Sequence, residues 1–206
     1  MPALMTESAK AKLRVEARRR RGAIEHATRA AASLALRAHL LAALPRIALA
    51  VGAAVAGYRA IRDEIDPEPA LIALQERGFA LALPVSLNKS VPLEFRSWRP
   101  GDPLSPDRLG VPAPEGTAKA VDPALILVPL LAFDHRGFRL GYGAGCYDRT
   151  LAAQRAARPV WALGLAFALQ EIECVPAAPH DSRLDGVITE RGLIWFGGND
   201  RSMSRK

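Results

Sequence analysis

The chain has 206 residues, and 50% of them are hydrophobic, so it is long enough to bury the core of one domain. Its two cysteines form no CxxC pair, which excludes a disulfide framework and a cysteine-rich zinc site. The longest apolar run, near residues 47–57, is too short to span a membrane, and the first residues do not follow the order of a signal peptide. We therefore expect one cytoplasmic domain over residues 1–206, with a flexible tail over 198–206.

The formal net charge is +7, and much of it lies near the two ends, in residues 10–21 and 201–206. Basic runs of this kind are typical either of a solvated helix and tail or of a site for an anionic ligand. A surface that binds RNA or DNA normally has aromatic residues interleaved with the basic ones. The run over 10–21 contains no aromatic residue. We therefore expect a small anionic ligand and no nucleic acid or membrane partner, and we assign residues 18–21 to a solvated helix face.

Helix-capping residues and apolar periodicity predict three helices in the first half of the chain, over residues 8–21, 28–44 and 67–78. Thr6 or Ser8 would cap the first helix, and Pro45 would stop the second. Apolar and alternating segments predict three short strands, over residues 53–58, 79–84 and 93–98. The first half therefore alternates between helices and strands.

The second half begins with a segment rich in proline and glycine, residues 99–123, which we expect to form an ordered loop or flap. The continuous apolar run over 125–133 predicts a central strand that is covered on both faces. A helix is expected over residues 147–157, and strands over 160–167, 185–190 and 192–197. This alternation predicts a layered α/β/α domain with a mostly parallel central sheet, whose ligand lies beyond the carboxyl ends of the strands.

The stretch RLGYGAGCYDRT, residues 139–150, follows the strongest predicted strand and leads into a helix. Glycines in this place let backbone N–H groups approach an anion closely, and the helix dipole favours negative charge there. A tight glycine turn beside a surface Asp–Arg pair would explain the same residues. The spacing matches neither GxxxxGK[ST] nor GxGxxG, so glycine content alone leaves both interpretations open.

A longer comparison decides between them, because FDHRGFRLGYGAGCYDRTL, residues 133–151, resembles the signature of the 5-formyltetrahydrofolate cyclo-ligase family. The family pattern is roughly FD-x-x-G-x-RLG-x-G-x-G-x-YD. Three further segments resemble family motifs in the expected order: KAKLR at 10–14, RDEID at 62–66 and PHDSRLDGVIT at 179–189. The resemblance covers about residues 9 to 190.

The resemblance implies an enzyme that uses ATP and Mg²⁺ to close 5-formyltetrahydrofolate, with or without a polyglutamate tail, to 5,10-methenyltetrahydrofolate. The formyl oxygen would attack the γ-phosphate, N10 would close on the activated carbon, and ADP and phosphate would be released. Such chemistry requires alignment and charge neutralisation rather than a side-chain nucleophile, which agrees with the lack of a Ser-His-Asp pattern. We expect the protein to act as a monomer.

On the nucleotide side, the resemblance implies that Lys10 and Arg14 hold phosphates from one face of the first helix. It implies a phosphate-binding loop made of Arg139, Leu140, Gly141, Tyr142, Gly143, Ala144, Gly145, Cys146 and Tyr147. Within this loop, Arg139 and Tyr147 would act as catalytic residues. Asp148 and Asp185 would hold Mg²⁺, a cation that is usually bound by one or two carboxylates and by phosphate oxygens.

On the folate side, Glu64 matches the family's folate-contacting glutamate, and its carboxylate suits the adjacent N–H donors of a pterin. Tyr58 could line the same pocket or pack in the core. Trp98 could stack on a substrate ring or cover the core. These three residues are the candidates for substrate binding.

Two positions depart from the family pattern. Ala144 stands where relatives often have glycine or lysine, and Cys146 stands where an aromatic residue is common. These departures motivate an alternative hypothesis, in which the chain is a non-catalytic relative that binds folate, a nucleotide or RNA on the same fold.

Overall fold

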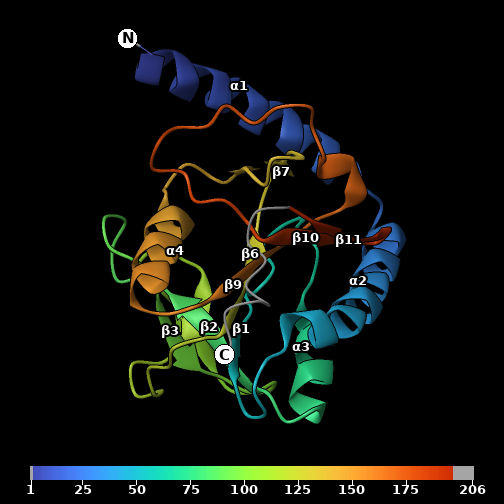
Figure 1. Ribbon diagram of the computed structural model, residues 1–206, viewed down its shortest axis with the longest axis vertical. Helices are drawn as coiled ribbons and strands as arrows, with labels where there is room; N and C mark the ends of the chain where they lie inside the picture. Colours follow the sequence, from blue (N-terminus) through green and yellow to red (C-terminus); the bar gives the residue numbers. More distant parts are fainter. Residues whose placement is uncertain (1, 197–206) are drawn as a thin grey trace, which may run out of the picture.

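The structure is a computed structural model that describes the backbone of residues 2–196 and the side chains of residues 7–196. The tail predicted over 198–206 lies outside these described residues. A seven-stranded sheet runs through the molecule in the order β11-β10-β9-β6-β1-β2-β3 (Figure 1). In chain order, its strands are β1 (Ala54–Ala56), β2 (Ala80–Val85), β3 (Glu94–Ser97), β6 (Leu125–Pro129), β9 (Trp161–Leu165), β10 (Gly186–Thr189) and β11 (Gly192–Trp195).

The sheet is mostly parallel, as the sequence predicted. The five central strands pair in parallel, and only the outermost strands β3 and β11 are antiparallel to their neighbours. The central strand β1 lies between β2 and β6, with Val55 opposite both Leu81 and Leu125. After β1 the chain continues to β2 on one side, whereas after β6 it continues to β9 on the other side. The order of the strands therefore reverses between β1 and β6.

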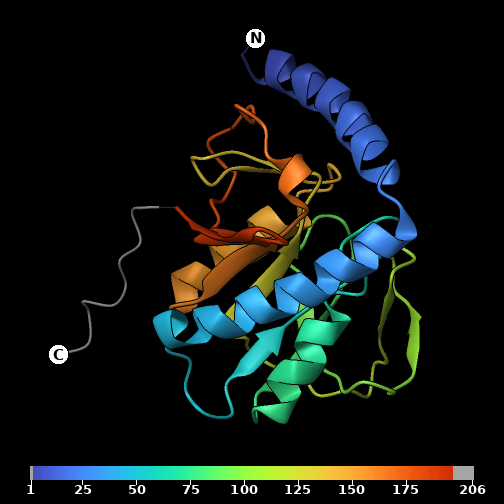
Figure 2. The ribbon, with the colours of Figure 1, turned by 90° about the vertical axis from the view of Figure 1, so that its right-hand side faces the viewer.

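Helices cover both faces of this sheet, which confirms the predicted α/β fold. Their bounds are α1 (Pro2–Gly22), α2 (His26–Ile47), α3 (Glu68–Glu76), α4 (Cys146–Ala157) and the short 3₁₀ helix η1 (Ala168–Gln170). Helices α2 and α3 pack together on one face, and α4 lies on the other (Figure 2). Helix α1 stands apart from these layers and runs across one end of the sheet (Figure 1).

The core divides between the two faces because side chains alternate along each strand. Val55 packs into the cluster beneath α2 and α3, whereas its neighbour Ala56 packs into the cluster beneath α4. Leu125 and Ile126 divide in the same way. A strand that is apolar on both faces therefore reads as a continuous apolar run in the sequence.

Two predicted helix ends are wrong. Helix α1 begins at Pro2, before Thr6 and Ser8, so neither of these residues caps it. Helix α2 runs through Pro45 and ends at Ile47, after which Ala48 takes a left-handed conformation and its N–H bonds the carbonyl of Leu44. Ile47 is buried in the core, and this packing holds the last turn in spite of the proline.

The apolar run over residues 125–133 is not one strand, which corrects the sequence prediction. Strand β6 ends at Pro129, and the chain continues in β7 (Ala132–Phe133), which pairs with β8 (Arg139–Leu140) in a separate small sheet. The carbonyl of Leu130 accepts hydrogen bonds from Gln170 Nε2 at 2.8 Å and from Arg21 Nη1 at 3.2 Å. These side chains satisfy a carbonyl that follows the end of β6 and, within the described residues, has no strand partner.

The segment over residues 99–123, predicted to form a loop or flap, contains a two-stranded sheet of β4 (Leu104–Pro106) and β5 (Pro112–Pro114). The Asp107 carboxylate organises the turn between them, because it accepts hydrogen bonds from the N–H groups of Ser86, Leu109 and Val111. Local side-chain bonds of this kind hold a turn that has little regular secondary structure.

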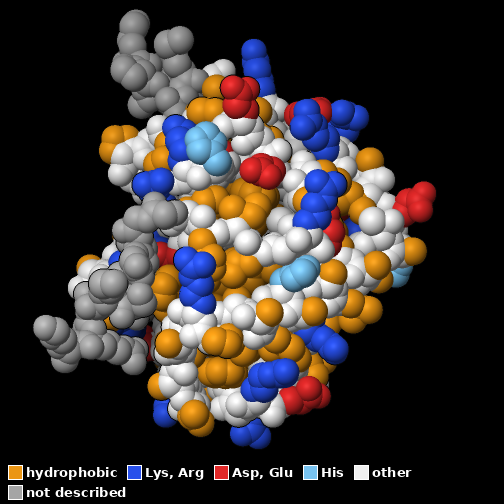
Figure 3. Space-filling view, turned by 45° about the vertical axis from the view of Figure 1, so that its right-hand side comes forward, with side chains coloured by type: hydrophobic (Ala, Val, Ile, Leu, Met, Phe, Trp, Pro, Cys, Tyr) orange, Lys and Arg blue, Asp and Glu red, His pale blue; other side chains and the backbone are white. Residues whose placement is uncertain are grey.

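The surface shows no single dominant feature in Figure 3. Lys and Arg side chains are spread among acidic and apolar ones on this face rather than gathered into one basic area. Among the described residues, no helix combines the length and the apolar character that crossing a membrane requires.

Candidate active site

A cleft of about 870 Å³ opens at the carboxyl ends of β1 and β6. It lies where the strand order reverses, which is the usual place for a ligand in an open α/β sheet. Its walls come from α1, the segment after β1, the loops around Ser86 and Asp107, the loop before α4, and residues 179–182. Four of the segments singled out in the sequence therefore meet in one cavity.

The glycine-rich loop, residues 141–145, forms the floor between β8 and α4. Gly143 has φ +104° and Gly145 has φ +65°, a left-handed region that side chains rarely adopt. A Cβ on Gly145 would also lie 2.7 Å from Nη1 of Arg149. The backbone shape of this loop therefore favours glycine at both positions, and residues 141–145 all line the cleft.

The first turn of α4 continues the loop and lines the cleft with Cys146, Tyr147 and Asp148. The N–H groups at the start of a helix attract anions. Arg149, one residue further, braces the loop because its Nη2 donates to the carbonyl of Ala144 at 2.7 Å and to that of Lys89. Its guanidinium therefore places a positive charge beside Ala144, a position whose own side chain carries no charge.

Lys10 and Arg14 reach the cleft from one face of α1, because they are four residues apart. Lys10 Nζ lies 2.6 Å from the carboxylate of Asp181. Arg14 pairs with Glu7 at 2.6 Å, and its Nε donates to the carbonyl of Gly141 at 3.1 Å. Both cations therefore line the cleft, and each is paired with a protein carboxylate.

Arg139 and Asp148 form an ion pair at the base of the loop. Arg139 Nη2 donates to Asp148 Oδ1 at 2.8 Å, and Nη1 donates to the carbonyl of Ser182. Burial lowers the pKa of Arg139, and the Asp148 charge opposes this effect. The N–H of Ser182 also donates to Asp148 Oδ1, at 3.0 Å, whereas Oδ2 accepts no hydrogen bond within the part of the chain that the structure describes.

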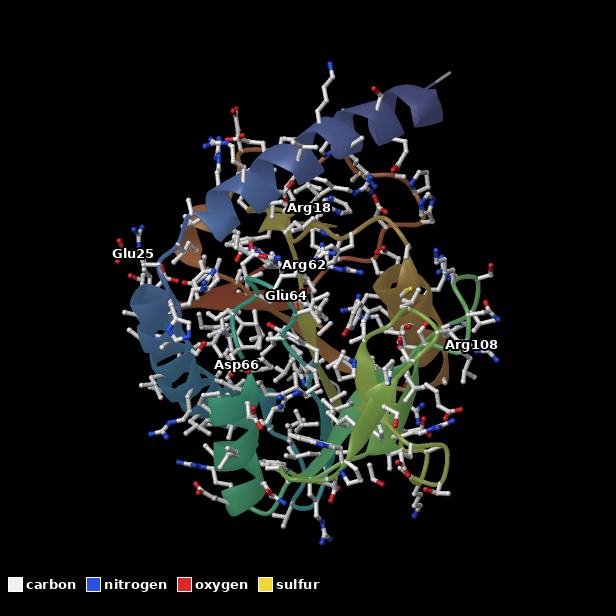
Figure 4. All side chains as sticks on the ribbon, turned by 180° about the vertical axis from the view of Figure 1, so that it is seen from behind. Arg18, Glu25, Arg62, Glu64, Asp66 and Arg108 are labelled. Carbon is white, nitrogen blue, oxygen red and sulfur yellow. The ribbon has the colours of Figure 1, made fainter. Side chains whose placement is uncertain are left out.

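Glu64 lines the cleft from the segment after β1, and it is labelled below α1 in Figure 4. Its Oε2 accepts the N–H of Ile61 at 3.0 Å, and its Oε1 accepts the hydroxyl of Tyr142 at 2.6 Å. Burial raises the pKa of Glu64, and these two hydrogen bonds oppose the rise. The carboxylate is thus fixed in direction at the cleft wall.

Two tyrosines complete this wall. The hydroxyl of Tyr58 donates to the carbonyl of Ile65 at 2.8 Å, so only its ring is left to line the cleft. Burial raises the pKa of Tyr147, and the charge of Glu64 raises it further. The Tyr147 phenol therefore stays protonated near neutral pH and can act as a hydrogen-bond donor.

Trp98 does not reach the cleft. It is 3% exposed and belongs to the core cluster beneath α2 and α3, whereas Phe95 on β3 belongs to the cluster on the other face. Side chains alternate between the two faces along β3, and Trp98 lies three positions after Phe95, so the two rings point to opposite faces. Of the two sequence interpretations, the structure therefore favours a core tryptophan over a substrate contact.

Asp185 is also absent from the cleft, against the expectation of a metal ligand. It is 2% exposed, and its Oδ2 lies 2.8 Å from Arg155 Nη2 and 2.7 Å from the N–H of Ala162. Asp185 precedes β10 and therefore lies at the amino end of a parallel strand, whereas the cleft lies at the carboxyl ends. Asp181, from the same motif, lines the cleft in its place.

Asp185→Asn is expected to lower the free energy of unfolding by about 2–4 kcal/mol, since it removes one partner of a buried ion pair. Its Mg²⁺ requirement should match that of the wild type. Urea unfolding and a Mg²⁺ titration of turnover measure the two effects. Asp122→Asn, which removes an exposed pair with Arg158, is the control and should change stability by less than about 1 kcal/mol. Wild-type stability with a raised Mg²⁺ requirement would contradict the structural role.

Arg21 was assigned to the solvated helix face, and this assignment is wrong. Arg21 is 1% exposed and forms two hydrogen bonds with the carboxylate of Asp63, at 3.0 and 3.1 Å. Its Nη2 also donates to the hydroxyl of Tyr142 at 2.7 Å. The signal was in the spacing, because Arg21 lies two helical turns after Arg14 and so shares its face.

Comparisons with known proteins agree on one family. Residues 6–190 match the profile of the 5-formyltetrahydrofolate cyclo-ligase family. A 5-formyltetrahydrofolate cyclo-ligase of Mycolicibacterium smegmatis is 34% identical over 152 residues, which is 69% of this chain and 77% of that protein. The Escherichia coli protein of the same name is 32% identical over 148 residues, 68% of this chain and 79% of that protein.

A solved structure is similar over nearly the full length. The NMR structure of Aquifex aeolicus 5,10-methenyltetrahydrofolate synthetase has a TM-score of 0.74 and 25% identity, and the match covers 92% of this chain and 93% of that one. The Mycoplasma pneumoniae synthetase, at 21% identity and a TM-score of 0.70, covers 88% of this chain and 98% of its own, and shares the fold.

Proposed function

This chain belongs to the 5-formyltetrahydrofolate cyclo-ligase family, and we propose that it makes 5,10-methenyltetrahydrofolate with ATP and Mg²⁺ through a phosphorylated formyl group. One observation carries the proposal. The α1 cations, the glycine-rich loop, Asp148 and Glu64 come from distant segments and line one cleft. At about 870 Å³, this cleft lies near the upper end of the range for ligand pockets, as two substrates side by side would require.

Phosphate binding is assigned to the loop and to the cations around it. Backbone N–H groups of residues 141–145 and the start of α4 would contact the triphosphate, with Lys10 and Arg14 on its outer side. Arg139 lies at the base of the loop, held in direction by Asp148. Arg149 would supply the charge that the position of Ala144 lacks, which favours turnover over the non-catalytic alternative.

Magnesium is assigned to Asp148, whose Oδ2 is left for a ligand, with Asp181 as a further carboxylate that lines the cleft. Over the described residues, no three or more His, Cys, Asp or Glu side chains gather as a metal site. The donor set therefore fits a cation that takes its remaining ligands from phosphate and water. Bound Mg²⁺ would neutralise phosphate charge during transfer.

The chemistry follows from aligning the two substrates. The formyl oxygen attacks the γ-phosphorus, the bond to ADP breaks, and the formyl carbon becomes electrophilic. N10 then adds to that carbon and loses its proton, and the oxygen leaves with phosphate. Glu64 would accept two N–H groups of the pterin and so fix its orientation. Tyr147 and Arg139 would donate hydrogen bonds to the developing negative charge.

The direct test mixes the purified chain with 5-formyltetrahydrofolate, ATP and Mg²⁺ and follows the near-ultraviolet absorbance of the methenyl product. We expect absorbance to grow with time and with enzyme, one ADP to form per product, and growth to stop when EDTA is added. Folded protein that binds folate or RNA but forms neither product nor ADP would favour the non-catalytic alternative instead. We also propose that the chain acts as one domain and as a monomer, since the segments of one chain are enough to line the cleft.

A further inference from the structure

Arg21 is a buried charge that the proposed reaction does not use. Its guanidinium is satisfied on three sides: the carboxylate of Asp63, the carbonyl of Leu130 at the end of β6, and the hydroxyl of Tyr142. A buried arginine with this many partners is held rigidly, because moving it would leave a charge unpaired in the interior. Arg21 therefore fixes the Tyr142 hydroxyl relative to the central sheet.

Tyr142 connects this fixed point to Glu64. Its hydroxyl accepts a hydrogen bond from Arg21 at 2.7 Å and donates one to Glu64 Oε1 at 2.6 Å. The ring also lies 5.7 Å from the guanidinium carbons of Arg18 and Arg21. The hydroxyl therefore orients the carboxylate that faces the folate side of the cleft.

The backbone of Tyr142, by contrast, belongs to the phosphate side. It lies between Gly141 and Gly143 in the glycine-rich loop, and Arg14 lies beside both glycines. The carbonyl of Gly141 accepts from Arg14 Nε at 3.1 Å, and a Cβ on Gly143 would lie 3.3 Å from the Arg14 guanidinium carbon. The main chain that carries Tyr142 is therefore part of the loop that we assign to phosphate binding.

We propose that Tyr142, held by Arg21, is a positioning residue that couples the two substrate sites: nucleotide on the loop stabilises the Glu64 arrangement that binds folate, and folate at Glu64 stabilises the loop arrangement that binds nucleotide. This inference rests on the proposed function. The coupling is positive because both sites require the Tyr142 side chain in the place that Arg21 gives it, so a ligand at either site stabilises the arrangement that the other ligand needs. By linkage, the effect on each affinity must be the same factor.

The test measures the dissociation constant of 5-formyltetrahydrofolate by calorimetry, with and without a non-hydrolysable ATP analogue and Mg²⁺. For the wild type we expect the analogue to tighten folate binding at least about fivefold, the lower end of typical coupling. Tyr142→Phe keeps the ring and removes only the hydroxyl, so its coupling factor should fall below about twofold. Arg21→Met should lose the coupling too.

Arg20→Met is the matched control, since Arg20 is the adjacent arginine and forms an exposed pair with Glu16. It should keep the wild-type coupling factor. A coupling factor in Tyr142→Phe within twofold of the wild type would overturn the inference, as would absence of coupling in a wild type that forms product. A wild type that neither binds folate nor forms product would instead overturn the proposed function, and the inference with it.

A pH profile separates positioning from general stability. The Tyr142 hydrogen bond lowers the pKa of Glu64, so this pKa should be higher in Tyr142→Phe than in the wild type. When the pH is lowered, the variant should therefore lose folate binding first, at a higher pH than the wild type. The charged and titratable groups that act on or near Glu64 are Tyr58, Asp63, Tyr142, Tyr147 and Arg21. Of these, the substitution changes only Tyr142, and an unmoved profile would contradict the positioning role.

Discussion

Asp148→Asn is expected to lower turnover at least about a hundredfold while the chain stays folded. Asparagine can still accept hydrogen bonds from Arg139 and Ser182 through its oxygen, so the local geometry should persist. It removes the negative charge that would bind Mg²⁺, and it leaves the buried Arg139 without its counter-charge. The Mg²⁺ concentration for half-maximal rate should therefore rise, as a titration of the variant would show.

The control for this prediction is Asp122→Asn, which also removes one carboxylate charge from an ion pair but lies outside the cleft. Its turnover and Mg²⁺ dependence should match the wild type, and both variants should be compared by thermal melting. If Asp148→Asn turned over normally at limiting Mg²⁺, Asp148 would have no role in holding the metal.

Glu64→Gln is expected to lower kcat/KM for 5-formyltetrahydrofolate about a hundredfold and to leave the affinity for the ATP analogue nearly unchanged. Two hydrogen bonds to a charged acceptor would be weakened, each worth about 1.5–3 kcal/mol. Glutamine also places an N–H₂ group where the carboxylate accepted, so one donor of the pterin would face another donor. Steady-state kinetics with the folate varied measure the first effect, and calorimetry with the ATP analogue measures the second.

Stability should not explain that loss. Burial raises the pKa of Glu64, so its carboxylate binds a proton more tightly in the folded chain than in the unfolded one. Such a carboxyl group contributes stability at low pH that is lost as pH rises through its folded pKa. At neutral pH the neutral glutamine is therefore expected to melt at or above the wild-type temperature. A strongly lowered melting temperature would assign Glu64 a structural role instead.

Acid should reproduce the Glu64→Gln effect in the wild type. As pH falls through the raised pKa of Glu64, the carboxylate gains a proton and can no longer accept both pterin N–H groups. Folate binding should therefore weaken at a pH above the usual titration range of a glutamate. Glu64→Gln should lack this phase, and a phase that persists in the variant would belong to another group.

Local pattern in the sequence determined much of this protein. Apolar runs placed the strands of a mostly parallel sheet, because a buried parallel strand is apolar on both faces. The spacing of Lys10 and Arg14 placed both on one side of α1, since a helix repeats every 3.6 residues. The glycine pattern of residues 141–145 marked a loop of exposed main chain before a helix. Each of these inferences depends on residues close together in the chain.

Only the tertiary structure decided which of these groups meet. In the sequence, Arg21 looks like its solvated neighbours. In the structure it is buried and forms hydrogen bonds with Asp63, Leu130 and Tyr142. Asp185 and Asp181 share one motif, yet the first lies at the amino end of β10 and the second lines the cleft. The packing of strands and helices decides which residues far apart in the sequence come into contact. A short motif does not show at which edge of the sheet, or on which face, its residues will lie.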